Sequence, residues 1–183
     1  AFVDPASTSG HLAPKTALIK AGLDPDSEME TMFAGSHPTS ALSVANGKVD
    51  AGATYEVNLF RLIDEGQIDW CAWPDGMHSK RRTAEEMAAV YEDCPEGHVV
   101  VIGFSDPIPT TPFAIRSDLP GDFKLAVKAA LLDVKNQPDI VAHIRRWFTD
   151  PTEELGLETL DQYYNVLREM ATLLDLDLKE LGS

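Results

Sequence analysis

A run of small, mostly hydroxyl-bearing residues, Ser7-Thr8-Ser9-Gly10, lies between an apolar segment and a run of helix-forming residues. Phe2-Val3 predicts a short strand, and Gly22 predicts the end of a helix. The start of a helix offers unpaired backbone N–H groups and a partial positive charge, and the hydroxyls add further donors. This turn therefore predicts a site for a tetrahedral oxyanion without any cationic side chain. The alternative is an ordinary helix cap with additional serines.

A second turn of the same kind follows at Gly35-Ser36-His37-Pro38. Thr31-Met32-Phe33 before it predicts a strand, and the helix after it is expected to end at Gly47. In parallel strand–helix units both helix starts lie at the carboxyl edge of one sheet, where open α/β sheets bind ligands. We therefore expect the His37 ring to donate to the same anion. The alternative is that Ser36 or His37 only caps the helix.

Acidic residues follow two further predicted strands. Tyr55 and Glu56 come after the strand expected over residues 48–53, and Asp106 follows the strand expected over residues 99–104. A carboxylate at this edge repels an oxyanion but attracts a cationic group at the far end of a ligand. Glu56 is therefore either a contact for an amino group or an ordinary exposed glutamate, and Asp106 is a further candidate at the same edge.

The elements around these turns predict an α/β fold. Strand, helix, strand, helix and strand over residues 2–53 imply a parallel sheet with right-handed crossovers. A helix is expected at residues 83–92, and a proline-rich passage at residues 105–116 is expected to cross between two lobes. After residue 120, helical spacing predicts three stripes that face a core. Their apolar residues include Phe123, Val127 and Leu131, then Ile140 and Val141, then Leu160, Tyr164 and Ala171.

The composition excludes several classes of protein. The 183 residues are 44% hydrophobic and 25% charged, which is typical of a soluble globular chain. A net charge of −15 argues against nucleic acid and anionic membranes as partners. The longest purely apolar run, Val99–Ile102, is too short to span a bilayer. With no GxGxxG and no Gly-Lys-Ser/Thr run, we expect no nucleotide site and no cofactor.

The two cysteines, Cys71 and Cys94, leave three alternatives open. An even, small number fits one disulfide in an exported protein, and it fits two free thiols in the cytosol equally well. The third alternative is a zinc site with His78 and His98, although the spacing has no CxxC and matches no compact zinc motif. We expect no metal.

Taken in order, the segments Phe2–Gly10, Phe33–His37 and Gly47–Gly52 resemble the phosphate/phosphite/phosphonate-binding periplasmic proteins of ABC transporters. Ile108-Pro109 with Pro112–Pro120 is similar to the return segment of that family. The resemblance implies a two-lobed, type II periplasmic binding fold. Residues 1–107 would form a parallel-sheet lobe with an insert at 61–98, and residues 108–183 the crossover and the helical C-terminal portion of the other lobe.

The resemblance also assigns roles to the residues singled out above. Ser7, Thr8 and Ser9 would grip phosphonate or phosphate oxygens, and His37 would contact the same group. Tyr55 is expected to lie in the ligand site, and Glu56 with Asp106 would meet the amino substituent of an aminophosphonate. The exported setting that the family implies favours the disulfide between Cys71 and Cys94.

The function expected from the resemblance is capture of a small phosphorus oxyanion for an ABC transporter permease, in the periplasm or at the cell surface. We expect a monomer without enzymatic activity, and we expect the family's N-terminal lobe segment to be absent, because residue 1 already lies in the opening strand. One alternative is a sensory or adaptor domain with the same fold. Another is a hydrolase with Ser7 or Ser9 as nucleophile and His37 as base, although no GxSxG run is present.

Overall fold

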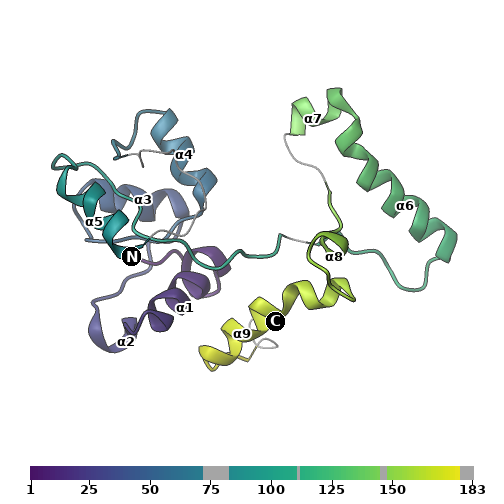
Figure 1. Cartoon of the computed structure of the whole chain (residues 1–183), viewed down its shortest axis with the longest axis horizontal. Helices are drawn as coiled ribbons and strands as arrows, with labels where there is room; N and C mark the ends of the chain where they lie inside the picture. Colours follow the sequence, from purple (N-terminus) through teal and green to yellow (C-terminus); the bar gives the residue numbers. More distant parts are fainter. Residues whose placement is uncertain (72–82, 111, 145–147, 178–183) are drawn as a thin grey trace. The chain divides into compact units, whose positions relative to one another are not determined.

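The computed structural model describes residues 1–71, 83–110, 112–144 and 148–177 (Figure 1). The chain forms two compact units, Ala1–Ile108 with Leu167–Ser183 and Pro109–Val166. The assignment of residues 1–107 and 108–183 to two lobes stays a prediction. No helix in the described ranges has the length and apolar composition needed to cross a bilayer.

Residues 1–3 lie between two other backbone segments of the first unit. On one side, Phe2 N donates to Met32 O and Ala34 N donates to Phe2 O, both at 2.8 Å. On the other side, Ala53 N donates to Ala1 O at 2.9 Å. The bridge between Phe2 and Phe33 is parallel. Three of the predicted strand segments therefore lie side by side.

These pairings are isolated bridges, and the described residues contain no β-sheet. A second parallel bridge joins Trp70 and Val99, with Cys71 N donating to Val99 O at 3.0 Å. The described part of the chain is mainly helical. The predicted parallel sheet is therefore not confirmed.

The helices predicted after the two turns and at residues 83–92 are confirmed. A short π-helical turn, η1 (Thr8–Leu12), leads into α1 (Ala13–Lys20), and α3 (His37–Ala45) follows the second turn (Figure 1). At this second turn the Ser36 hydroxyl accepts from Thr39 N at 3.2 Å, and Gly47 adopts a positive φ of 62° just beyond the helix. The remaining helices of this unit are α2 (Pro25–Glu28), α4 (Glu56–Asp64), α5 (Ala84–Glu92) and most of α9 (Asn165–Leu173).

The core of the first unit lies where α3 packs against α4. Its buried side chains are Ala41 from α3, Leu59 and Leu62 from α4, and Ile68 after α4. Val99 and Val101 pack against this cluster. The core therefore holds in place the N-terminal ends of both helices, where the sequence predicts ligand-binding residues.

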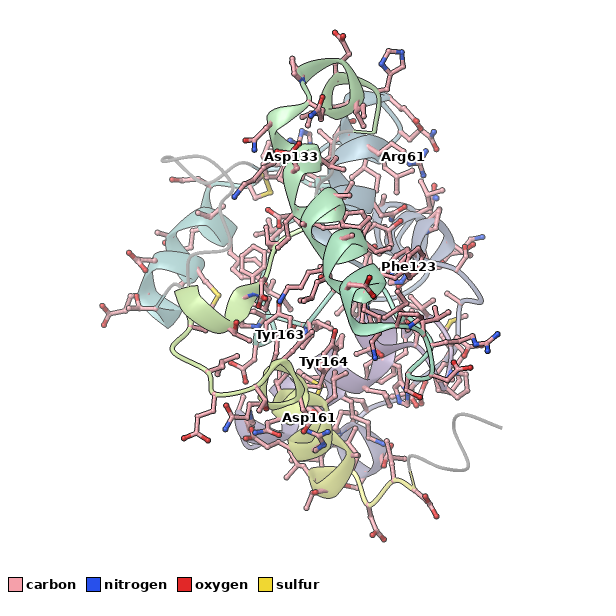
Figure 2. All side chains as sticks on the ribbon, turned by 90° about the vertical axis from the view of Figure 1, so that its right-hand side faces the viewer. Arg61, Phe123, Asp133, Asp161, Tyr163 and Tyr164 are labelled. Carbon is pink, nitrogen blue, oxygen red and sulfur yellow. A yellow bond between two sulfur atoms is a disulfide. The ribbon has the colours of Figure 1, made fainter. Side chains whose placement is uncertain are left out.

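The second unit is built from short, consecutive helices. They are α6 (Gly121–Asp133), the 3₁₀ turn η2 (Val134–Asn136), α7 (Pro138–Ile144), α8 (Pro151–Glu154) and the 3₁₀ turn η3 (Leu160–Tyr164). Tyr163 and Tyr164 lie together, with ring centroids 5.5 Å apart (Figure 2). An ion pair between Lys128 and Asp150 joins α6 to the segment before α8. The hydrogen bond from Lys128 is the largest cause, and the one from the Thr152 hydroxyl the second largest, that lowers the pKa of Asp150 to about 2.

The prediction that the stripe on α6 faces a core is wrong. No residue of α6 is buried, and Phe123, which Figure 2 labels near the start of this helix, is 51% exposed. Ile140 and Leu160 of the next two stripes are exposed as well. The physical reason is that the short helices of this unit do not form a second layer over α6 within the described residues. In the third stripe Ala171 is buried, as predicted, but it lies in the first unit.

Candidate ligand-binding site

The parallel pairing of the three backbone segments brings their following residues to the same side of the first unit. Residues 4–10 follow the first segment, Ser36 and His37 follow the second, and residues 54–56 follow the third. Because parallel segments run in one direction, the residues that follow them gather at one end. This is the arrangement that the two turn motifs predicted.

The first turn is closed by its own hydrogen bonds. Ser7 N donates to Asp4 O at 3.0 Å, and Gly10 N donates to Ser7 Oγ at 3.1 Å. The amides of Ser7 and Gly10 are therefore used inside the turn, and Ser7 caps η1. Thr8 and Ser9 open the helix, where backbone N–H groups have no earlier carbonyl of the helix to bond. Their amides and the hydroxyl protons of Ser7 and Thr8 remain suited to donate to a ligand.

Gly10 is required by close packing at this turn. A Cβ on Gly10 would lie 2.4 Å from Cβ of Val3 and 2.9 Å from the Ser7 hydroxyl. Val3 N also donates to Gly10 O at 2.9 Å. Any side chain at this position would push the turn away from the first backbone segment, so Gly10 holds the serines near the other two turns.

His37 contacts residues from both of the other segments. Its Nε2 lies 3.3 Å from Ser9 Oγ, and its ring centroid lies 4.4 Å from that of Tyr55, with the two planes inclined by 68°. These side chains are far apart along the chain. The structure therefore brings together Ser9, His37 and Tyr55 from three separate turns.

The environment of His37 keeps its ring neutral. Burial lowers the pKa of His37 below its ordinary value of 6.5. The Nδ1 atom is buried, and no hydrogen-bond partner for it is present among the described residues. A neutral imidazole has a single N–H, so His37 contributes one donor and no charge at neutral pH.

Two acidic residues were also predicted for this site, Glu56, which follows Tyr55 along the chain, and Asp106. Glu56 is the exposed first residue of α4, where its charge is favourable at the helix start, and no described side chain pairs with it. Asp106 forms an ion pair with Lys20 at 2.9 Å. Lys20 is the last residue of α1. The place of Asp106 in the ligand site stays a prediction.

Asn58 is a residue of this region that the sequence analysis missed. It is 2% exposed, and its Nδ2 donates to Thr54 Oγ1 at 2.9 Å. This bond ties α4 to the backbone just before Tyr55. Asn58 stands beside Leu59 on the buried side of the helix. Its amide could have indicated a structural role there, because a buried amide requires hydrogen-bond partners.

The two cysteines are joined by a disulfide, with an S–S distance of 2.02 Å and a Cα–Cα distance of 5.8 Å. A zinc site would need both thiolates, so the disulfide removes that alternative. His78 lies outside the described residues. Elsewhere in the described ranges, no group of three or more histidine, cysteine or acidic side chains is arranged to hold a metal ion.

Comparison with known proteins places the chain in a family. A sequence model described as "ABC transporter, phosphonate, periplasmic substrate-binding protein" matches residues 1–155. The chain therefore belongs to this family of periplasmic substrate-binding proteins. Membership implies the type II periplasmic binding fold and an extracytoplasmic location. Families of this kind are generally not enzymes.

A stretch of 75 residues is 41% identical to the phosphate-import protein PhnD of Mycolicibacterium smegmatis. The match covers 37% of this chain and 23% of that protein. The chain therefore matches less than a quarter of the length of this relative.

Proposed function

We propose that the chain captures a phosphonate, phosphite or phosphate anion as the solute-binding component of an ABC transporter. The observation that carries this proposal is the 3.3 Å contact between Ser9 Oγ and His37 Nε2, since it joins the two turns that offer anion donors. The monomeric state and the α/β sheet around the parallel bridges belong to the same proposal.

The chemistry of the site suits a phosphorus oxyanion. Hydroxyls of Ser7, Thr8 and Ser9 and the amides that open η1 are neutral donors. Hydrogen bonds from neutral donors to an ionised oxygen are about twice as strong as those between neutral groups. Several such bonds can hold a charged tetrahedral group without a lysine or arginine, and release remains possible because no opposite charge is buried.

Glu56 would select among these ligands. It lies one residue beyond Tyr55, whose ring packs against His37. A phosphonate with an amino group could place its oxygens at Ser9 and its cation at Glu56. Asp106, which forms an ion pair with Lys20 at 2.9 Å, is proposed as a second acidic contact for the same amino group.

The contact between Ser9 and His37 also has the form of a nucleophile beside a base, so the hydrolase alternative must be compared with binding. In such enzymes the second ring nitrogen donates to a group that orients the histidine. The described residues supply no acceptor for Nδ1 of His37. This supports binding without catalysis as the function of the site.

Isothermal titration calorimetry of the protein containing this chain tests the proposal. Phosphate, phosphite and methylphosphonate are the ligands, and chloride at equal ionic strength is the control. We expect one of the three to bind, and Ser9→Ala to weaken it by about 10- to 100-fold, the loss of a hydrogen bond to a charged group. Ser117→Ala, at an exposed serine of the second unit, should leave the affinity unchanged. The proposal fails if none of the three gives heat or a thermal shift.

A further inference from the structure

We propose that His11 is a positioning residue that joins the hydroxyl-bearing turn, residues 7–9, to the backbone segment leading to the second turn. Its ring donates a hydrogen bond to the Pro5 carbonyl before the turn and packs against Phe33 of that second segment. His11 acts through the turn and does not touch the ligand. The inference rests on the proposed function, and it adds a residue that neither turn motif includes.

The first step concerns the hydrogen bonds of His11 across the turn. Its Nδ1 lies 2.8 Å from Pro5 O, and a carbonyl oxygen only accepts, so Nδ1 carries the proton. Its backbone N donates to Ser7 O at 2.9 Å. Thr8 and Ser9, whose amides are suited to bind an anion, lie between these attachments along the chain. The His11 ring therefore links the backbone before Ser7 to the helix after Ser9.

The second step concerns the orientation of the imidazole, which two aromatic rings hold. Its centroid lies 4.9 Å from that of Phe2, with the planes inclined by 63°, and 5.1 Å from that of Phe33, with the planes inclined by 84°. Aromatic rings prefer such edge-to-face contacts. Phe2 is 8% exposed, and a parallel bridge pairs it with Phe33. Both rings thus stand on paired backbone, and they keep Nδ1 directed at Pro5 O.

The third step connects His11 to the second turn. Phe33 lies two residues before Gly35, whose amide donates to Val3 O at 2.8 Å. Ser36 and His37 follow directly. A displacement of the first turn would therefore push the His11 ring against the segment that carries the second turn. Because hydrogen bonds weaken steeply as distance and angle depart from their optimum, a ligand held by both turns needs them in fixed register.

Nitrogen-15 NMR of the histidine rings tests the hydrogen bond in the ligand-free protein. The measurement is made at alkaline pH, where imidazoles are neutral. We expect His11 as the Nδ1–H tautomer, because only this form donates to Pro5 O. A neutral His11 with its proton on Nε2 would overturn the inference, whatever the protein binds.

Two substitutions separate the hydrogen bond from the packing of the ring. His11→Asn places an amide N–H near the position of Nδ1 and removes the ring, whereas His11→Phe keeps an aromatic ring and removes the donor. With the anion found by calorimetry, we expect His11→Asn to bind within about threefold of the wild type and His11→Phe to lose about tenfold. A role limited to packing gives the opposite order. Wild-type affinity in His11→Phe, or a loss in His11→Asn as large as in His11→Phe, overturns the inference.

His143→Phe is the matched control for the loss of such a bond. The Nδ1 atom of His143 also lies 2.8 Å from a backbone carbonyl oxygen, that of Asp139. His143 is exposed on α7 in the second unit, so this substitution should leave the affinity unchanged. A loss as large as that of His11→Phe would show that the effect does not come from the turn, which also contradicts the inference.

Amide hydrogen exchange supplies a readout without ligand. The Gly10 amide, bonded to Ser7 Oγ at 3.1 Å, reports on the turn. We expect it to exchange about tenfold faster in His11→Phe and at nearly the wild-type rate in His11→Asn. Unchanged exchange in His11→Phe overturns the positioning role. If the wild type binds none of the three anions while Gly10 shows the expected pattern, the proposed function fails and the attachment of the turn by His11 stands.

Discussion

At the scale of single residues, the candidate site is made from common side chains whose chemistry depends on their contacts. Ser9 alone is a spare hydroxyl in a capped turn, and His37 alone is the first residue of a helix. Their 3.3 Å contact and the packing of Tyr55 against the ring bring these side chains together. The Ser7 hydroxyl oxygen instead accepts a hydrogen bond from Gly10 N and caps η1. The three hydroxyl residues of the turn are therefore not equivalent.

Glu56→Gln tests selection at this scale. The substitution removes the charge and keeps the shape, so it should weaken 2-aminoethylphosphonate several-fold because the attraction to its ammonium group is lost. Methylphosphonate lacks that group and should bind as before. Calorimetry of both ligands with both proteins gives the comparison. Equal losses for the two ligands would remove Glu56 from this role, and Glu65→Gln, at the exposed end of α4, is the control.

At the scale of elements, the site depends on two helices whose starts are held by one core. Leu59 and Leu62 of α4 pack with Ala41 of α3, and the N-terminal ends of these helices carry Tyr55 and His37. Gly10 fixes the third turn by its close approach to Val3. Ligand contacts in this arrangement therefore depend on packing that lies outside the site.

Leu62→Ala tests this dependence. Leu62 is 1% exposed, so the substitution should reduce the free energy of unfolding by about 2–5 kcal/mol through lost burial and a residual cavity. Urea denaturation measures the change. Val57→Ala in the same helix is the matched control: Val57 is 65% exposed, and the expected change is within about 0.5 kcal/mol. Similar losses for both variants would show that α4 does not pack through Leu62.

At the scale of the whole molecule, membership of a periplasmic substrate-binding family agrees with a covalent cross-link in the chain. The disulfide joins Cys71 to Cys94 over a separation of 23 residues, next to the bridge between Trp70 and Val99. A cross-link of this kind restricts the unfolded chain and suits an oxidising compartment. It therefore belongs with the extracytoplasmic location that the family implies.

Mass spectrometry tests the cross-link. Protein purified without reductant, then denatured and treated with iodoacetamide, should gain no alkyl group, and the same sample treated after reduction should gain two. Reduction should also lower the free energy of unfolding by about 3 kcal/mol, from the loop-closure entropy of a loop of this size. Two alkyl groups on the unreduced sample would exclude the disulfide.

Three helices of the first unit, α1, α3 and α5, could be predicted from the sequence because their signals act locally, whereas α2 and α4 were not predicted. Pro38 and Gly47 bound α3, and the capping box of Thr83 and Glu86 starts α5, by bonds within a few residues. The order of the two turns was also enough to place Ser9 and His37 at one expected edge. The prediction that α6 faces a core was wrong because burial is not a local property. Helical spacing predicts that a helix has an apolar face, but it does not predict which element packs against that face.

The sequence by itself determined which short segments turn, cap and begin helices, because those preferences depend on neighbouring residues. Only the tertiary structure decided that Ser9 meets His37 and that Tyr55 packs on the ring. It likewise decided that Asp106 pairs with Lys20. Each of these contacts joins residues far apart along the chain, and their formation depends on how the intervening elements pack. No local pattern carries that information.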